Sequence, residues 1–75
     1  MSPPTGERTD YRGWRYWVVV IPASADRWAF AAHFERGNDP ERTRRANATY
    51  TTMQEAALRG DRYARDWIDE WGGIL

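Results

Sequence analysis

The sequence predicts an α+β fold, a three-stranded antiparallel meander with one C-terminal helix packed on one face, in the order β-β-β-α. Three observations support this prediction. A run of eight residues rich in aromatic and β-branched side chains extends from Trp14 to Ile21, and residues 27–36 alternate between large apolar side chains and small or polar ones. Residues 53–71 place apolar side chains at steps of three and four. The first two patterns are typical of strands and the third of an amphipathic helix.

The first strand is expected to start at Tyr11 or Trp14 and to end at Ile21, because Pro22 cannot donate to a strand ladder. Successive side chains in a strand point to opposite faces, so both faces of this strand are apolar. One face would carry Trp14, Tyr16, Val18 and Val20, and the other would carry Arg15, Trp17, Val19 and Ile21.

The second strand is expected over residues 27–36 and the third over residues 44–51. The turn between them lies in residues 37–42, which include Gly, Asn, Asp and Pro. The side chains that face the core would be Trp28, Phe30, Ala32 and Phe34 from the second strand, with Ala46, Ala48 and Tyr50 from the third. The opposite side would carry Ala29, Ala31, His33 and Glu35, with Arg45, Asn47 and Thr49.

The helix is predicted over residues 53–71. Thr52 and Glu55 have the spacing of a capping box, in which the threonine hydroxyl accepts from the backbone N–H three residues further on. Gly60 lies within the apolar stripe, where a glycine costs about 1 kcal/mol relative to alanine, so close packing on the sheet is expected there. Gly72 and Gly73 are expected to end the helix in the left-handed conformation.

Composition indicates the domain organisation, the cellular location and the charge balance of the chain. Residues 1–10 are mostly polar and contain two prolines, so we expect a disordered N-terminal tail followed by a single domain over residues 11–75. The 75 residues include no cysteine, and no basic start leads into an apolar run. We therefore expect a cytoplasmic protein, outside the membrane and of bacterial type, with no disulfide. Eleven arginines balance eleven acidic residues, which argues against a strongly basic or strongly acidic partner.

One helix can cover one face of such a sheet, so the second apolar face predicts an interface. A contiguous apolar patch rarely stays bare on a soluble monomer. The candidate interface residues are Arg15, Trp17, Val19, Ile21, Ala29, Ala31, His33, Arg45 and Asn47.

Three alternatives remain for what packs against that face. The first, which we favour, is a second copy of the chain, because small side chains on the second strand let two sheets approach. The second is a single nucleic-acid strand, held by Trp17, His33, Arg15 and Arg45. The third is the chain's own tail, residues 1–10 or the C-terminal residues 74 and 75.

Catalytic chemistry is not expected. The chain has one histidine, His33, and no cysteine, and Ser24 lies in a turn with nothing to bring it to the histidine. Asp66, Asp69 and Glu70 share a helix face, but Arg62 and Arg65 would pair with them there. We predict no catalytic residue, no metal ligand and no cofactor.

The chain resembles small, mostly uncharacterised bacterial single-domain proteins of β-β-β-α layout. Two motifs carry the resemblance: "YRG" at the start of a strand, and a helix of the form Y-T-T-x-x-E-A-A-x-x-G-x-x-x-A-x-x-W-I-D. Here they are Tyr11, Arg12 and Gly13, and Tyr50, Thr51, Glu55, Ala56, Gly60, Ala64, Trp67, Ile68 and Asp69. The resemblance covers most of residues 11–69 and implies a shared fold, with no activity attached.

The sequence therefore predicts a small interaction or regulatory module that acts by binding, as a homodimer through its second sheet face or with another protein partner. The alternative is weak binding of single-stranded nucleic acid on the same face.

Overall fold

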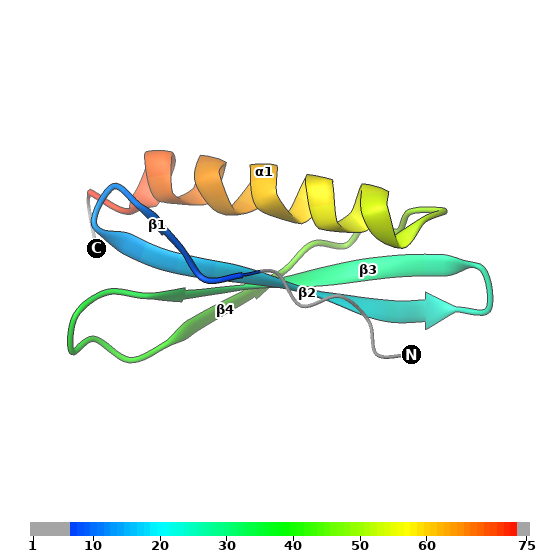
Figure 1. Ribbon diagram of the computed structural model, residues 1–75, viewed down its shortest axis with the longest axis horizontal. Coiled ribbons are helices and arrows are strands. Elements are labelled where there is room, and N and C mark those ends of the chain that lie inside the picture. Colours follow the sequence, from blue (N-terminus) through cyan, green and yellow to red (C-terminus); the bar gives the residue numbers. More distant parts are fainter. Residues whose placement is uncertain (1–6, 74–75) are drawn as a thin grey trace.

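A computed structural model describes residues 7–73 of the chain. The elements are β1 (Thr9–Tyr11), β2 (Trp14–Ser24), β3 (Arg27–Glu35), β4 (Arg42–Arg45) and α1 (Met53–Trp71). The strands form one antiparallel sheet in the order β1-β2-β3-β4, and α1 lies along one face of it (Figure 1). The prediction of an α+β fold with an antiparallel sheet and a C-terminal helix is confirmed, and the predicted number of strands is wrong, because the sheet has four.

The additional strand is β1, whose three residues pair with Trp14–Tyr16 of β2. Arg12 and Gly13 join the two strands, and both have positive φ, 49° and 85°. Two such residues form the tight turn that matches the twist of a hairpin. Thus β1 includes Thr9 and Asp10, which the sequence analysis assigns to the tail, whereas residues 1–6 of that tail lie outside the described residues.

The β2–β3 hairpin is the centre of the sheet, and its register matches the predicted faces. Tyr16 pairs with Phe34 and Val18 with Ala32, so these large and small apolar side chains share the side that faces α1. The strand does not end at Ile21, since Pro22 lies inside β2 opposite Trp28. A proline is tolerated there because β1 pairs no further than Tyr16, which leaves this edge of β2 without a partner strand among residues 7–73.

The last strand lies earlier than predicted, at 42–45 instead of 44–51. It pairs with β3 up to Arg45 opposite Ala31, and then an isolated bridge joins Trp28 to Tyr50. Three residue steps on β3, from Ala31 to Trp28, thus face five steps from Arg45 to Tyr50. Because of these two extra residues, positions 46–49 leave the ladder, and Ala46 and Ala48 do not form the predicted core row.

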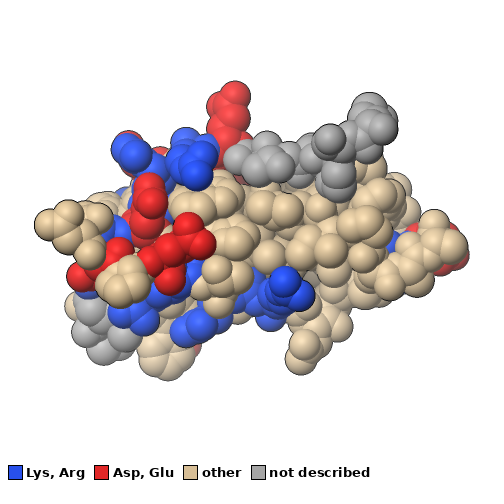
Figure 2. Space-filling model, turned by 90° about the horizontal axis from the view of Figure 1, so that it is seen from below, with Lys and Arg blue, Asp and Glu red and all other residues tan. Residues whose placement is uncertain are grey.

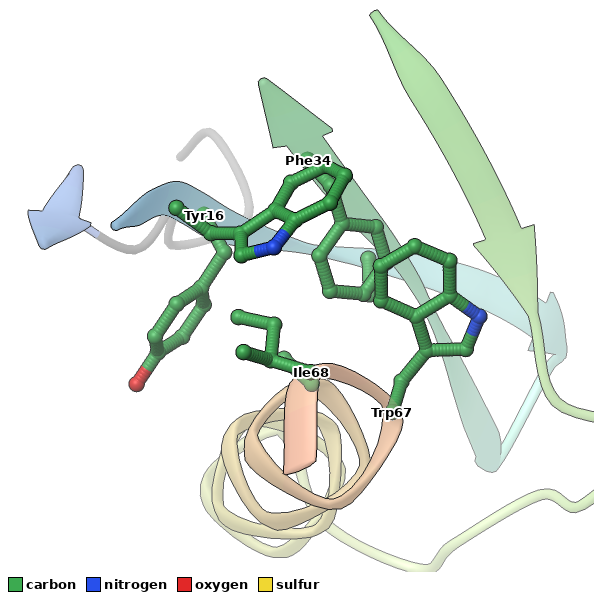
Figure 3. Close-up of a cluster of buried hydrophobic side chains, with 7 residues drawn as sticks. Tyr16, Phe34, Trp67 and Ile68 are labelled. Atoms are coloured by element: carbon green, nitrogen blue, oxygen red, sulfur yellow. The ribbon is translucent and has the colours of Figure 1, made fainter. Parts of the chain in front are cut away.

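The core lies between α1 and the β2–β3 hairpin. Trp67 packs edge-on against Trp14, with ring centroids 5.3 Å apart, and stacks on Phe34 at 4.2 Å. Figure 3 shows this cluster, which consists of Trp14, Tyr16, Ala32, Phe34, Ala64, Trp67 and Ile68. A Cβ on Gly60 would collide with Val18 and come within 3.1 Å of Phe30, so the predicted close packing is confirmed.

The helix termini agree with the prediction at one end. The hydroxyl of Thr52 accepts a hydrogen bond from the backbone N–H of Glu55 at 3.0 Å. At the other end neither glycine has a positive φ, and Gly72 is right-handed at −62°, so the predicted left-handed stop is wrong. A glycine is required at 72 for a different reason, because a Cβ there would lie 2.7 Å from Nε1 of Trp14.

Polar contacts fix α1 along its β1 side. The hydroxyl of Tyr16 donates to Asp61 and accepts from Nε of Arg65 at 3.0 Å, and Asp61 and Arg65 form the i,i+4 ion pair at 3.2 Å. Burial raises the pKa of Tyr16, and its hydrogen bond to Asp61 raises it further. The hydroxyl of Tyr11 reaches Asp69 at 2.9 Å in the same way.

Candidate interaction face

Eight of the nine predicted interface residues share the side of the sheet away from α1, which we call the reverse face. The register pairs Arg15 with Glu35, Trp17 with His33, Val19 with Ala31 and Ile21 with Ala29, and it places Arg45 beside Ala31. The ninth residue, Asn47, lies in the segment that leaves the ladder and is exposed. Thr43 and Asp10, which the sequence analysis omitted from this face, occupy positions on it opposite His33 and Arg15.

Trp17 is covered by other residues of the chain, although α1 lies on the opposite side of the sheet. Its indole stacks on the imidazole of His33, with centroids 5.3 Å apart and planes 11° from parallel. The guanidinium of Arg8 lies 4.4 Å from its centroid, and the residue is 8% exposed. Arg8 belongs to the 1–10 segment, so one residue of the tail covers part of the reverse face; sequence reasoning missed it because no pattern links Arg8 to Trp17.

His33 is held by the β3–β4 hairpin. Its Nδ1 lies 3.1 Å from the hydroxyl of Thr43 and 3.5 Å from a carboxylate oxygen of Glu41. Ser24 is seven residues along β2 from Trp17, the partner of His33, which is roughly 24 Å at about 3.4 Å per residue. The histidine therefore stacks on Trp17 and hydrogen-bonds with Thr43, and Ser24, the hydroxyl considered in the sequence analysis, lies far from it.

Arg15 lies in an ion-pair cluster at one end of the reverse face. Its Nε is 2.9 Å from Asp10, and its Nη1 is 3.8 Å from Glu35. The hydrogen bond to Asp10 is the main cause of the raised pKa of Arg15. The same three residues line one wall of a hollow of about 530 Å³ that extends to Trp14 and Arg36. The positive charge of Arg15 is therefore balanced by two carboxylates of the chain itself, and an added anion would have to compete with them.

The other half of the reverse face is apolar. Val19, Ile21 and Ala29 are half-buried, and Ala31 is buried; we call these four residues the apolar strip. They lie toward the β2–β3 turn, away from the Arg15 cluster. Figure 2 views the sheet from the side opposite α1 and shows most of the charged side chains toward one end, with mainly uncharged surface among the described residues toward the other end.

The comparisons with known proteins give no relative. No protein-family model, curated protein or solved structure matches the chain, so the resemblance to small bacterial domains stays a prediction. Between residues 7 and 73 there is no helix that combines the length and the apolar character needed to cross a membrane. Across the same residues, no three His, Asp or Glu side chains come together as a metal site would require.

Proposed function

We propose that this protein is a small binding module without catalytic activity, and that its reverse face pairs with a second copy of the chain to form a homodimer. The observation that supports the proposal best is the apolar strip, which is partly open to solvent and has no charged member. Open apolar surface on a small domain commonly marks an interaction site. A cytoplasmic location is part of the proposal and is supported by the cysteine-free sequence.

The chemistry of the strip favours a second copy as the partner. Two sheets stack face to face at about 10 Å, and two alanines on β3 leave room for side chains of a facing sheet at that spacing. The strip lies toward the β2–β3 turn, so a two-fold axis across it would place strip on strip. The Arg15 cluster, at the far end, would then keep its solvent-exposed ion pairs.

Nucleic acid is less well supported as the partner of this face. Base stacking needs an aromatic ring with an open side. The two sides of Trp17 are taken by Arg8 and His33, and the guanidinium of Arg15 faces Asp10 and Glu35.

Sedimentation equilibrium from micromolar to near-millimolar protein tests the dimer. The unchanged chain should behave as a dimer at the upper end of this range. Ile21→Arg, which places a charge in the strip, should shift the protein to monomer, and Ala29→Arg tests the same strip from the neighbouring strand.

A matched control is Leu58→Arg, which adds the same charge to a residue of α1 that is 61% exposed. This variant should leave the dimer unchanged. A monomer at every concentration would contradict the proposal, and so would a dimer that survives both strip variants while circular dichroism shows them folded.

A further inference from the structure

A groove runs between β4 and the C-terminal half of α1, on the opposite side of the sheet from the reverse face. It has a volume of about 400 Å³ and is lined by Arg42, Arg44, Tyr63, Trp67 and Trp71. The groove exists because one helix packs over β2 and β3, so that the edge strand β4 extends beyond it. Figure 3 shows the indole of Trp67 within the core cluster, on the side of the helix nearest β4. We call this feature the β4–α1 groove.

Positive charge in the groove is not neutralised by its own lining. Arg42 is half-buried, its Nε has no hydrogen-bond partner, and its guanidinium has no ion pair among residues 7–73. The guanidinium of Arg44 donates to the carbonyl of Thr43 at 3.1 Å and lies 6.0 Å from the ring centroid of Trp67. The residues that line the groove include no Asp or Glu. Two guanidiniums thus face a hollow in which an anion would be the natural counterpart, since Arg presents a fork of donors that matches phosphate.

Flat aromatic surface lies beside this charge. Trp71 is 45% exposed, which is unusual for a large apolar side chain, and Tyr63 and Trp67 extend the aromatic wall toward the core. An exposed indole next to arginines is the combination on which proteins stack nucleobases while holding the attached phosphate. The groove therefore pairs an anion site with a stacking platform.

We propose that the β4–α1 groove binds a nucleotide unit, with its phosphate on Arg42 and Arg44 and its base stacked on Trp71. The unit is either a free mononucleotide or one residue of a single strand, because both present the same phosphate and base. This site is separate from the proposed dimer face and does not depend on it.

Neighbouring residues of β4 provide a matched pair of variants. Arg44 pairs with Ala32 and lies on the groove side, whereas Arg45 pairs with Ala31 and lies on the reverse face. Both are exposed, so Arg44→Gln and Arg45→Gln remove the same charge from adjacent positions without disturbing the core. Trp71→Ala removes the stacking surface.

The test is a titration of the full chain at low salt, followed by tryptophan fluorescence and calorimetry. The probes are adenosine monophosphate, a single-stranded oligoadenylate of about eight residues and inorganic phosphate. Arg44→Gln and Trp71→Ala should each weaken binding of the nucleotide probes about tenfold, because one base stack or one good phosphate contact is worth about that much. Arg45→Gln should change it by less than about twofold.

Each outcome decides the proposal. Binding of the mononucleotide and the strand with equal affinity supports a free nucleotide as the source, and tighter, salt-sensitive binding of the strand supports nucleic acid. Inorganic phosphate that binds as tightly as the nucleotide would overturn the base-stacking site. Loss of binding in Arg45→Gln, or no binding of any probe at millimolar concentration, would overturn the groove as the site.

Discussion

Trp67 and Trp17 are equally shielded from solvent, at 8% exposed each, but they lie on opposite faces of the sheet and are covered in different ways. Trp67 packs between the apolar rings of Trp14 and Phe34 beneath the helix. Trp17 contacts the guanidinium of Arg8 and the imidazole of His33, on the side of the sheet away from α1. The exposed fraction alone therefore does not distinguish a core tryptophan from one that stacks with polar side chains at the surface. The two are distinguished by the residues that cover them.

The difference has an energetic meaning. A guanidinium over an exposed aromatic ring contributes about 0.5–1 kcal/mol, and arginine returns to water at little cost when the ring is removed. A ring that packs against other core rings, as Trp67 does against Trp14 and Phe34, leaves a cavity when it is deleted. The two tryptophans should therefore respond differently to the same substitution.

Trp67→Ala should have the largest effect. It removes the central ring of the core cluster, and large-to-small core changes of this kind cost about 3–5 kcal/mol of unfolding free energy. Urea denaturation followed by circular dichroism measures the loss, which is a large part of the stability of a domain this small.

Trp17→Ala is the matched comparison on the reverse face. We expect it to cost about 1–2 kcal/mol, because Arg8 and His33 can close over the site or become hydrated, and cavity costs fall when a site can collapse. If this variant unfolds as readily as Trp67→Ala, the distinction between the two faces is wrong.

Gly60→Ala should have an effect of the same order as Trp17→Ala, and it tests how closely α1 packs on the sheet. An alanine in an exposed helix position would gain about 1 kcal/mol over glycine. Here the new Cβ would collide with Val18, so we expect a net loss of about 1–3 kcal/mol from overpacking. A fall in the urea midpoint would support overpacking, and a rise would contradict it. As a control, Leu58→Ala on the exposed surface of the helix should change the free energy of unfolding by less than about 0.5 kcal/mol.

The smallest effect is expected from the titration of Tyr16. Burial and the bond to Asp61 raise the pKa of its hydroxyl above the usual value of 10.0, so the folded state favours the protonated form. This contribution is complete below the unfolded pKa and is lost as pH rises through the folded pKa. The free energy of unfolding should thus decline above about pH 10.

Denaturation of Tyr16→Phe over the same alkaline range is the control. The variant is less stable at neutral pH because it lacks the bonds to Asp61 and Arg65, but its alkaline decline should be shallower. An equally steep decline in the variant would assign the pH dependence to other groups.

The sequence predicts the centre of this fold better than its edges. The strand-forming run at 14–21 and the alternation at 27–36 are long enough to define the two central strands and the side chains that face the helix, and the 53–71 stripe is long enough to define the helix. The edge strand β1 has three residues, too few for a pattern, and its Arg12–Gly13 turn is a weaker signal than Asn-Gly. The other edge strand, β4, has the sequence Arg-Thr-Arg-Arg, which has no apolar alternation. The alternation of alanines with polar residues after it therefore predicted a strand that extends to residue 51.

The candidate sites divide in the same way. Eight reverse-face residues could be assigned from alternation alone, because they belong to the two central strands and the strand next to them. The position of Arg8 over Trp17 joins two segments without any periodic relation, and the groove at Arg42 and Arg44 depends on where β4 begins. Contacts of this kind follow from tertiary placement, which local patterns do not encode.

The order β1-β2-β3-β4 has a consequence for how the chain reaches its structure. Every strand pairs with its neighbour in the sequence, through turns of a few residues, so the sheet can form without closing a long loop. Folds with mainly local pairings fold fast for their size. The contacts that join the most distant parts of the sequence are those of α1 with β2 and β3. We therefore expect the docking of α1 on the sheet to limit the folding rate.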